Sequence, residues 1–229
     1  DMKSDYKKLL EELKAVGQRD VVPIETIEQD YAISFLLKTM SEHPELSETL
    51  VFRGGTSFRK CYFPNYRYSM DLDYSVRESL PLEQYNRVLG DVARQTQELM
   101  MAAHPGLEFQ VALKQVGERG EHGDNQDAHK FLVKFPWHLQ HKNPARAGRM
   151  VKLDTSHSEP VLLGTEKRQL IHRYGISTVT SSVTCLTLDE LLAEKYVAMC
   201  DVLSRREQDG RQSTRPRDYF DVEQVLAGQ

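Results

Sequence analysis

The chain has 229 residues, a formal net charge of −4 at pH 7, 39% hydrophobic residues and 28% charged residues. This length suits one large domain or a compact pair of small ones, and the composition excludes a fibrous or disordered chain. No apolar run approaches the roughly 20 residues that cross a bilayer, and the first residues form no signal-peptide core. We therefore expect a cytoplasmic protein without a membrane partner.

The cysteines and the charge pattern exclude further classes. Cys61, Cys185 and Cys200 lie far apart in sequence without a Cys-x-x-Cys pair, so we expect reduced, packed thiols and no zinc clip. The net charge gives no global attraction to nucleic acid. Basic residues gather at 142–152 and 205–217, where they form either local anion-binding patches or solvated surface.

Two helices are predicted at the start of the chain. The first covers 4–16 with Ser4 as its N-cap, and the second runs from Pro23 to about residue 42 because proline suits a first helical turn. In the second helix Ile27, Tyr31 and Phe35 recur at helical spacing, which predicts one buried stripe.

A strand, glycine turn and helix unit follows. The strand covers 50–53 and runs into the turn 54–57, after which a short helix is expected up to residue 63. The alternating segment 71–76 predicts the next strand. Farther along we expect a helix over 81–103, strands over 107–116, 130–137 and 148–153, a loop over 117–127, a helix from 188 and a last helix from about 217. This order predicts an α+β fold with a mixed sheet and a helical C-terminal part.

The glycine turn is the first candidate for function. Gly54 and Gly55 are followed by Thr56, Ser57 and the short helix. Glycines let backbone N–H groups approach a triphosphate, and the helix start adds positive potential for an anion. The two hydroxyls could donate to phosphate as well. A Gly-Gly turn alone is more often only a turn, so a second signal is required.

Asp71 and Asp73 provide the second signal. Side chains alternate along a strand, so both carboxylates project from one face and can hold a hard cation, Mg²⁺ or alternatively Mn²⁺. Asp154 ends the apolar alternation of the strand over 148–153 and is the third candidate metal ligand. The competing interpretations are a solvated Asp-x-Asp edge and an aspartate that only begins the turn 154–156. With the glycine turn, the three carboxylates predict metal-assisted phosphoryl transfer.

A lysine in the C-terminal part is the next candidate. Lys195 lies in an apolar helical stretch, where burial is costly unless an anion binds the ammonium group. A triphosphate would be such an anion, and a surface pair with Glu190 or Glu194 is the alternative.

Three more polar residues complete the set of candidates. Asp218 could orient Lys195, whereas Asp221 could cap a helix or pair with Arg217, and we favour Asp218 for the site. Ser69, just before the first aspartate, is a candidate phosphate contact.

Several motifs in this order resemble AbiEii/AbiGii-type toxin nucleotidyltransferases, the group that includes the mycobacterial MenT toxins. Met70 stands where an acidic residue is common in that group. The matching segments are 27–31, 51–57 with 67–73, 152–154, 191–195 and 217–221.

The resemblance implies a polymerase-β-like core over 1–185, N-terminal helices included, and a helical part over 186–229 that completes the active site. It implies a toxin of a bacterial toxin–antitoxin or phage-defence pair with a cognate antitoxin. The expected reaction transfers a nucleoside monophosphate (NMP) from a nucleoside triphosphate (NTP) to RNA, with the tRNA 3′ end as the leading acceptor. Asp154 would position or deprotonate the acceptor hydroxyl, and Lys195 would stabilise the triphosphate.

Other readings of the same residues stay open. The acceptor could be a protein or a small molecule, or the chain could be a nucleotide-binding module without turnover. For an RNA acceptor we expect a basic surface beside the site, formed by Lys142, Arg146, Arg149, Arg205, Arg206 and Arg211.

Overall fold

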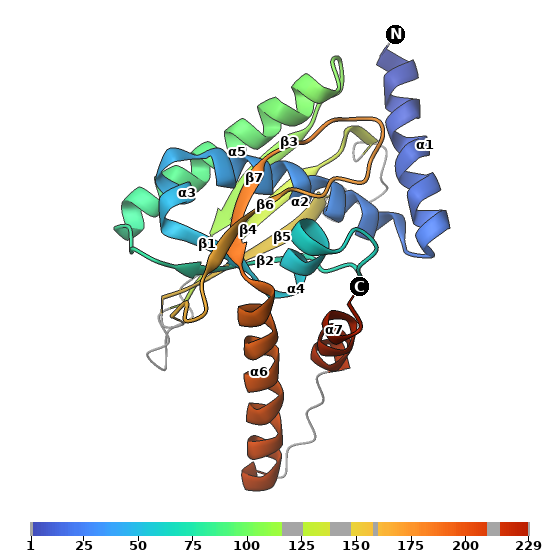
Figure 1. Ribbon diagram of the computed structural model, residues 1–229. Coiled ribbons are helices and arrows are strands. Elements are labelled where there is room, and N and C mark those ends of the chain that lie inside the picture. The colour runs from blue at the N-terminus through green and yellow to red at the C-terminus, as the bar shows by residue number, and fades with distance from the viewer. Residues whose placement is uncertain (1, 116–125, 138–147, 158–159, 210–215, 229) are drawn as a thin grey trace.

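The protein combines one seven-stranded mixed sheet with helices, as the α+β prediction requires (Figure 1). The computed structural model describes residues 2–115, 126–137, 148–157, 160–209 and 216–228. The sheet order is β3-β4-β5-β2-β1-β7-β6. The elements are α1 (Met2–Asp20), α2 (Ile24–Glu42), α3 (Pro44–Thr49), β1 (Leu50–Arg53), α4 (Gly54–Ser57), η1 (Phe58–Tyr62), β2 (Asp71–Val76), α5 (Leu82–Ala103), β3 (Gln110–Gln115), β4 (Gln126–Lys134), β5 (Gly148–Ser156), β6 (Thr165–Gln169), β7 (Ser182–Leu186), α6 (Leu188–Asp209) and α7 (Pro216–Leu226).

Most of the predicted elements are confirmed, with corrected ends. The first helix begins before Ser4, which therefore lies inside α1 and is not its N-cap. The expected loop over 117–127 is wrong at its end, because Gln126 and Asp127 belong to β4, and residues 116–125 lie outside the described part. Three short elements were not predicted from the sequence: α3, β6 and β7.

Helix α2 is the centre of the core, and the prediction of a single buried stripe is wrong. Buried side chains lie around the whole helix and include two acids, Glu28 and Asp30. Asp30 binds Arg59 Nε at 2.9 Å and Lys60 Nζ at 2.9 Å, so the buried carboxylate is compensated by two buried cations. These ion pairs fasten η1, which follows the glycine turn, to the core.

The sheet turns one face to the helices. Phe131, Val133, Val151 and Leu153, on β4 and β5, are completely buried on that face. The residues that alternate with them on the other face are half-buried or exposed. An antiparallel half-sheet of this kind, with one covered face and one open face, is common.

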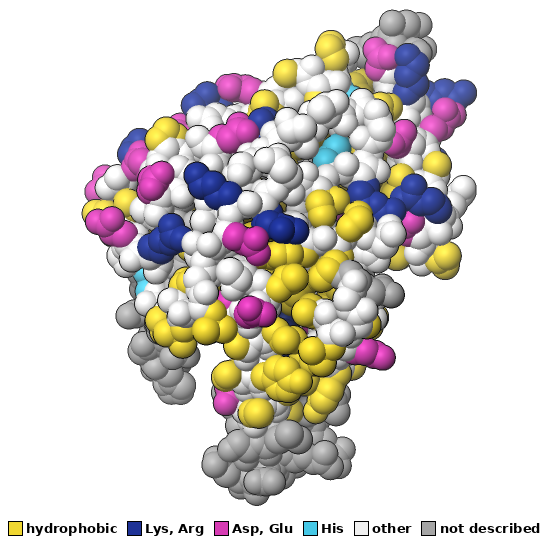
Figure 2. Space-filling model, viewed as in Figure 1, with side chains coloured by type: hydrophobic (Ala, Val, Ile, Leu, Met, Phe, Trp, Pro, Cys, Tyr) yellow, Lys and Arg dark blue, Asp and Glu magenta, His cyan; other side chains and the backbone are white. Residues whose placement is uncertain are grey.

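The C-terminal helices form a separate projection. Figure 1 shows α6 extending away from the sheet with α7 beside it. Thr187 caps α6, because its hydroxyl oxygen accepts a hydrogen bond from the Glu190 backbone N–H at 3.3 Å. The domain boundary after residue 185 stays a prediction. Figure 2 shows hydrophobic side chains gathered over this lower part of the molecule; exposed examples on the two helices are Tyr196, Val197, Tyr219, Phe220 and Leu226.

The thiol prediction is confirmed for two of the three cysteines. Cys61 and Cys185 are buried and free, whereas Cys200 is exposed, so the expectation that it is packed is wrong. Among the described residues, no helix has the combination of length and apolar character that crossing a membrane requires.

A strained residue ends α1. Val21 has φ +56° and is 88% exposed, and the Val22 N–H donates to Gly17 O at 3.0 Å in the manner of a Schellman cap. A β-branched residue in this conformation costs on the order of 1–2 kcal/mol. We expect Val21→Gly to raise the free energy of unfolding by about 1 kcal/mol in urea denaturation. A destabilised variant would contradict the strain argument.

Candidate active site

Three charged residues form a row across the middle of the sheet. Strand pairing sets Arg53 on β1 opposite Asp73 on β2, and Asp73 beside Asp154 on β5. Asp71 lies one pleat away on the same face, beside Lys152. The expectation that Asp154 ends its strand or begins a turn is wrong, because β5 continues through Ser156 and pairs with β2 and β4.

The row opens into a cavity of about 380 Å³ between the sheet and the C-terminal helices. This cavity brings together residues that are distant in sequence, from the glycine turn, the two aspartate strands and both helices. Of the sequence-predicted residues, those that line it are Gly54, Gly55, Asp73, Asp154, Lys195 and Asp218. Arg53, Tyr74, Thr155, Ser156, Glu194 and Ala198 complete the lining.

The glycine turn is built around Asp73. Gly54 has φ +73°, and a Cβ atom there would overlap Asp73 Oδ2. The Thr56 hydroxyl donates to Asp71 O at 2.5 Å, and the Ser57 hydroxyl donates to Gly54 O at 2.7 Å. Both hydroxyl protons are therefore used inside the protein, where they fix the turn against β2. Phosphate contact by these hydroxyls stays a prediction that requires them to exchange partners.

Ser69 flanks the second glycine. A Cβ atom on Gly55 would lie 3.0 Å from Ser69 Oγ and 3.0 Å from Arg67 Nη2. The turn is thus in contact with the loop that leads into Asp71, which places the serine hydroxyl beside the glycine backbone.

Lys195 reaches both candidate carboxylates of α7. Its Nζ lies 2.7 Å from Asp218 Oδ1 and 3.1 Å from Asp221 Oδ2. Asp218 is thus in the position that its predicted orienting role requires, and Asp221 contacts the same ammonium group. Asp221 does not pair with Arg217 in the described contacts. It is fully buried and accepts two bonds from Arg67, at 2.7 Å each, so it also fastens α7 to the core.

The alternative partners proposed for Lys195 are engaged elsewhere. Glu190 accepts hydrogen bonds from the backbone N–H groups of Leu162 and Leu163. Glu194 Oε1 lies 3.0 Å from Arg53 Nη2. A lysine paired with acids of its own helix is therefore not what the structure shows.

Arg53 and Glu194 are cavity residues that sequence reasoning missed. Burial raises the pKa of Glu194 to about 7 despite the Arg53 guanidinium. Burial, followed by the charges of Asp71 and Asp154, raises the pKa of Asp73 to about 6. Perturbed carboxylates gathered in one cavity are typical of functional sites. Only the docking of α6 against the sheet brings Glu194 to Arg53 and Asp73, so no local pattern marks Glu194 as a site residue.

A divalent cation fits the chemistry of these carboxylates. Asp154 Oδ1 is buried without a hydrogen-bond partner in the described structure, and its Oδ2 contacts Lys152 Nζ. The pKa of Asp73 is raised first by burial and then by the neighbouring charges of Asp71 and Asp154. Both features would be relieved by a cation. Within the described residues, however, no three His, Cys, Asp or Glu side chains are grouped closely enough to hold a metal, so a cation held by all three aspartates requires their side chains to move closer together.

The predicted basic approach to the site is not supported. Arg149 lies on β5, five residues before Asp154. Its Nε lies 2.5 Å from Glu28 Oε2, and the residue does not line the cavity. Lys142, Arg146 and Arg211 lie outside the described residues, as do the side chains of Arg205 and Arg206. Arg149 therefore does not line the cavity, and an approach formed by the other basic residues stays a prediction.

Comparison with protein families matches residues 36–229 to the family described as nucleotidyl transferase AbiEii toxin, type IV TA system. The matched range contains the glycine turn, the aspartate strands and both C-terminal helices. A comparison with curated proteins gives no match. Since the family match covers most of the chain and every cavity residue, the chain belongs to the AbiEii nucleotidyl transferase toxin family of type IV toxin–antitoxin systems.

Proposed function

We propose that this transferase moves NMP from an NTP onto RNA, with the 3′ end of a tRNA as acceptor. The observation that carries the proposal is the row of Asp73 and Asp154 on adjacent strands, with the glycine turn at one side and Lys195 across the cavity. Two carboxylates, a glycine turn and the Lys195 ammonium group around one cavity suit phosphoryl transfer. In that reaction, positioning and charge neutralisation provide the rate gain.

Each residue has a distinct role in the proposed reaction. The backbone N–H groups of Gly54 and Gly55 bind the triphosphate, and Lys195 neutralises its charge from α6. Asp154 positions the acceptor 3′-hydroxyl and accepts its proton as the oxygen attacks the α-phosphorus. The bond to pyrophosphate breaks in line, so no covalent enzyme intermediate is required. Asp218 holds the Lys195 ammonium at 2.7 Å and thereby orients it.

Asp71, Asp73 and Asp154 would hold Mg²⁺, with Mn²⁺ as an alternative. When bound, the cation would neutralise the triphosphate and the charge that develops during transfer. We further propose that the sheet and glycine turn form a polymerase-β-like core, in which Asp73 and Asp154 lie side by side on neighbouring strands. As a toxin of a toxin–antitoxin pair, the protein would act in the cytoplasm under control of a cognate antitoxin.

The proposal is tested by incubating the protein with each α-³²P-labelled NTP, Mg²⁺ and either total RNA or cell protein. We expect label from one NTP or a preferred subset on RNA, at the 3′ end of tRNA after nuclease mapping. EDTA should abolish the label. Label on protein alone would replace the RNA acceptor by a protein acceptor, and NTP binding without any label would indicate a binding module.

A further inference from the structure

The face of the sheet that carries the aspartates also carries lysines. Strand register sets Asp71 beside Lys152, Lys152 opposite Lys130, and Lys130 opposite Lys114. Lys134 is four residues after Lys130 on β4, so the alternation of a strand gives it the same face. We call Lys114, Lys130, Lys134 and Lys152 the lysine row.

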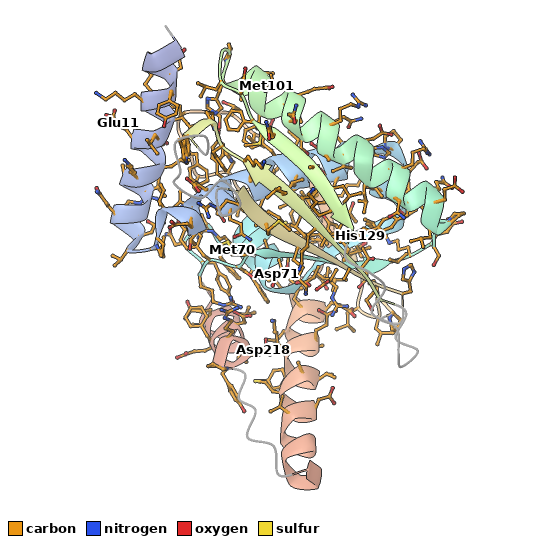
Figure 3. The ribbon with its side chains drawn as sticks, turned by 180° about the vertical axis from the view of Figure 1, so that it is seen from behind. Glu11, Met70, Asp71, Met101, His129 and Asp218 are labelled. Atoms are coloured by element: carbon orange, nitrogen blue, oxygen red, sulfur yellow. The ribbon has the colours of Figure 1, made fainter. Side chains whose placement is uncertain are left out.

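This row is on the open face of the sheet. The intervening residues Phe131, Val133 and Val151 are completely buried against the helices, so their neighbours project the other way. Lys114 is exposed and the other three lysines are half-buried. Figure 3 shows β3, β4 and β5 side by side, with Asp71 near the end of the sheet from which α6 projects.

The lysines repel one another. Like charges directly opposite on neighbouring strands are destabilising, and strands lie about 4.8 Å apart, so Lys114, Lys130 and Lys152 span roughly 10 Å. Lys152 contacts Asp154. For Lys114, Lys130 and Lys134, the described part of the chain provides no ion pair. A regular row of like charges that the described residues leave largely uncompensated suits a repeating anion outside the chain.

We propose that the lysine row binds the phosphate backbone of the acceptor RNA. The proposal rests on RNA as the acceptor in the proposed function and locates the surface that holds it. The row leads directly to Asp71 and Asp73, so a strand bound along it would bring its 3′ end to the cavity. A chain of net charge −4 can hold a polyanion only through such a local positive surface.

The test uses the triple variant Lys114→Gln, Lys130→Gln, Lys134→Gln, which leaves Lys152 beside Asp154 intact. Its matched control is Lys7→Gln, Lys8→Gln, Lys14→Gln on exposed positions of α1, with the same change in net charge. Binding of a fluorescein-labelled RNA hairpin with a single-stranded 3′ end is measured by anisotropy from 50 to 300 mM salt. Over about this range of salt concentration, phosphate contacts produce a measurable fall in RNA affinity.

We expect the triple variant to bind RNA at least about tenfold more weakly and the slope of log K against log[salt] to shrink by about 2, since each lost contact removes about 0.7. NTP binding should be unchanged, and the control should match the wild type. Should the triple variant misfold by circular dichroism, Lys114→Glu at its exposed position should still weaken RNA binding.

Equal RNA affinities and salt slopes in the triple variant and the control would overturn the proposal. So would unchanged RNA binding together with lost binding of polyglutamate, which would favour an acidic protein on this surface. If the wild type labels RNA and the triple variant binds RNA as the wild type does, the proposed function stands without this inference. If the row governs RNA binding but no NMP reaches RNA, the row stands and the proposed function fails.

Discussion

The Asp73→Asn variant should lose NMP transfer by about 10³-fold or more while keeping its fold, because it removes the central carboxylate charge at nearly constant shape. Asp73 stands between Arg53 and Asp154 in the ladder, so no neighbour can substitute for it. Label incorporation into RNA and growth inhibition on expression measure the loss. Asp91→Asn, at a helix-surface carboxylate paired with Arg94, is the control and should remain active.

The same substitution should stabilise the protein at neutral pH. The pKa of Asp73 is raised from 3.8 to about 6, so the folded state favours the neutral acid. The protonated Asp73 carboxyl therefore contributes to the free energy of unfolding; this contribution is complete below pH 3.8 and is lost as pH rises through about 6. The neutral asparagine keeps it, so the variant should gain on the order of 1–3 kcal/mol over the wild type at pH 7.5 and little at pH 4.

Urea denaturation of both proteins at the two pH values, in EDTA, measures this difference. If Asp73 binds Mg²⁺, adding Mg²⁺ at pH 7.5 should reduce the difference in free energy of unfolding between the variant and the wild type. The reason is that the cation stabilises only the protein that carries the carboxylate. Equal stability at both pH values would show that the repulsion among the aspartates is too weak to matter. Retained transfer in Asp73→Asn would refute the assignment of the site.

Local patterns predicted the part of the site that a single stretch of chain encodes. The strands 50–53 and 71–76 are placed as expected, because apolar residues and period-two alternation mark them directly. The short helix begins at Gly54 itself, not after the turn. The alternation of apolar residues also located Asp154. The predicted end of its strand is wrong, because Thr155 and Ser156 do not form a turn and instead pair with β2.

Long-range features could not be read from the sequence. Helix α2 was assigned one buried stripe, because the sequence does not show that the buried acids Glu28 and Asp30 pair with Arg149 and Arg59. The pairing of Arg53 with Glu194 and of Asp221 with Arg67 joins segments more than 100 residues apart. The lysine row likewise exists only in the register of three strands, β3, β4 and β5. Tertiary packing decides all of these.

Gly54→Ala should reduce NMP transfer by about 10²-fold or more, although it adds one methyl group. The backbone at Gly54 has φ +73°, which costs an L-residue about 1 kcal/mol or more, and the new Cβ would overlap Asp73 Oδ2 and lie 3.0 Å from Asp73 Cγ. The carboxylate must move out of its row, and small displacements of reacting groups carry large rate penalties.

Gly90→Ala is the matched control for this change. A Cβ on Gly90, inside α5, meets nothing within 4 Å, so the control should keep full transfer and gain about 0.5–1 kcal/mol of stability from its helical preference. Transfer rates, NTP affinity by titration calorimetry and urea denaturation are measured for both. Normal transfer in Gly54→Ala would mean that the turn tolerates a side chain beside Asp73. The carboxylate position would then be independent of the glycine turn, and the coupling between turn and aspartate row would have to be abandoned.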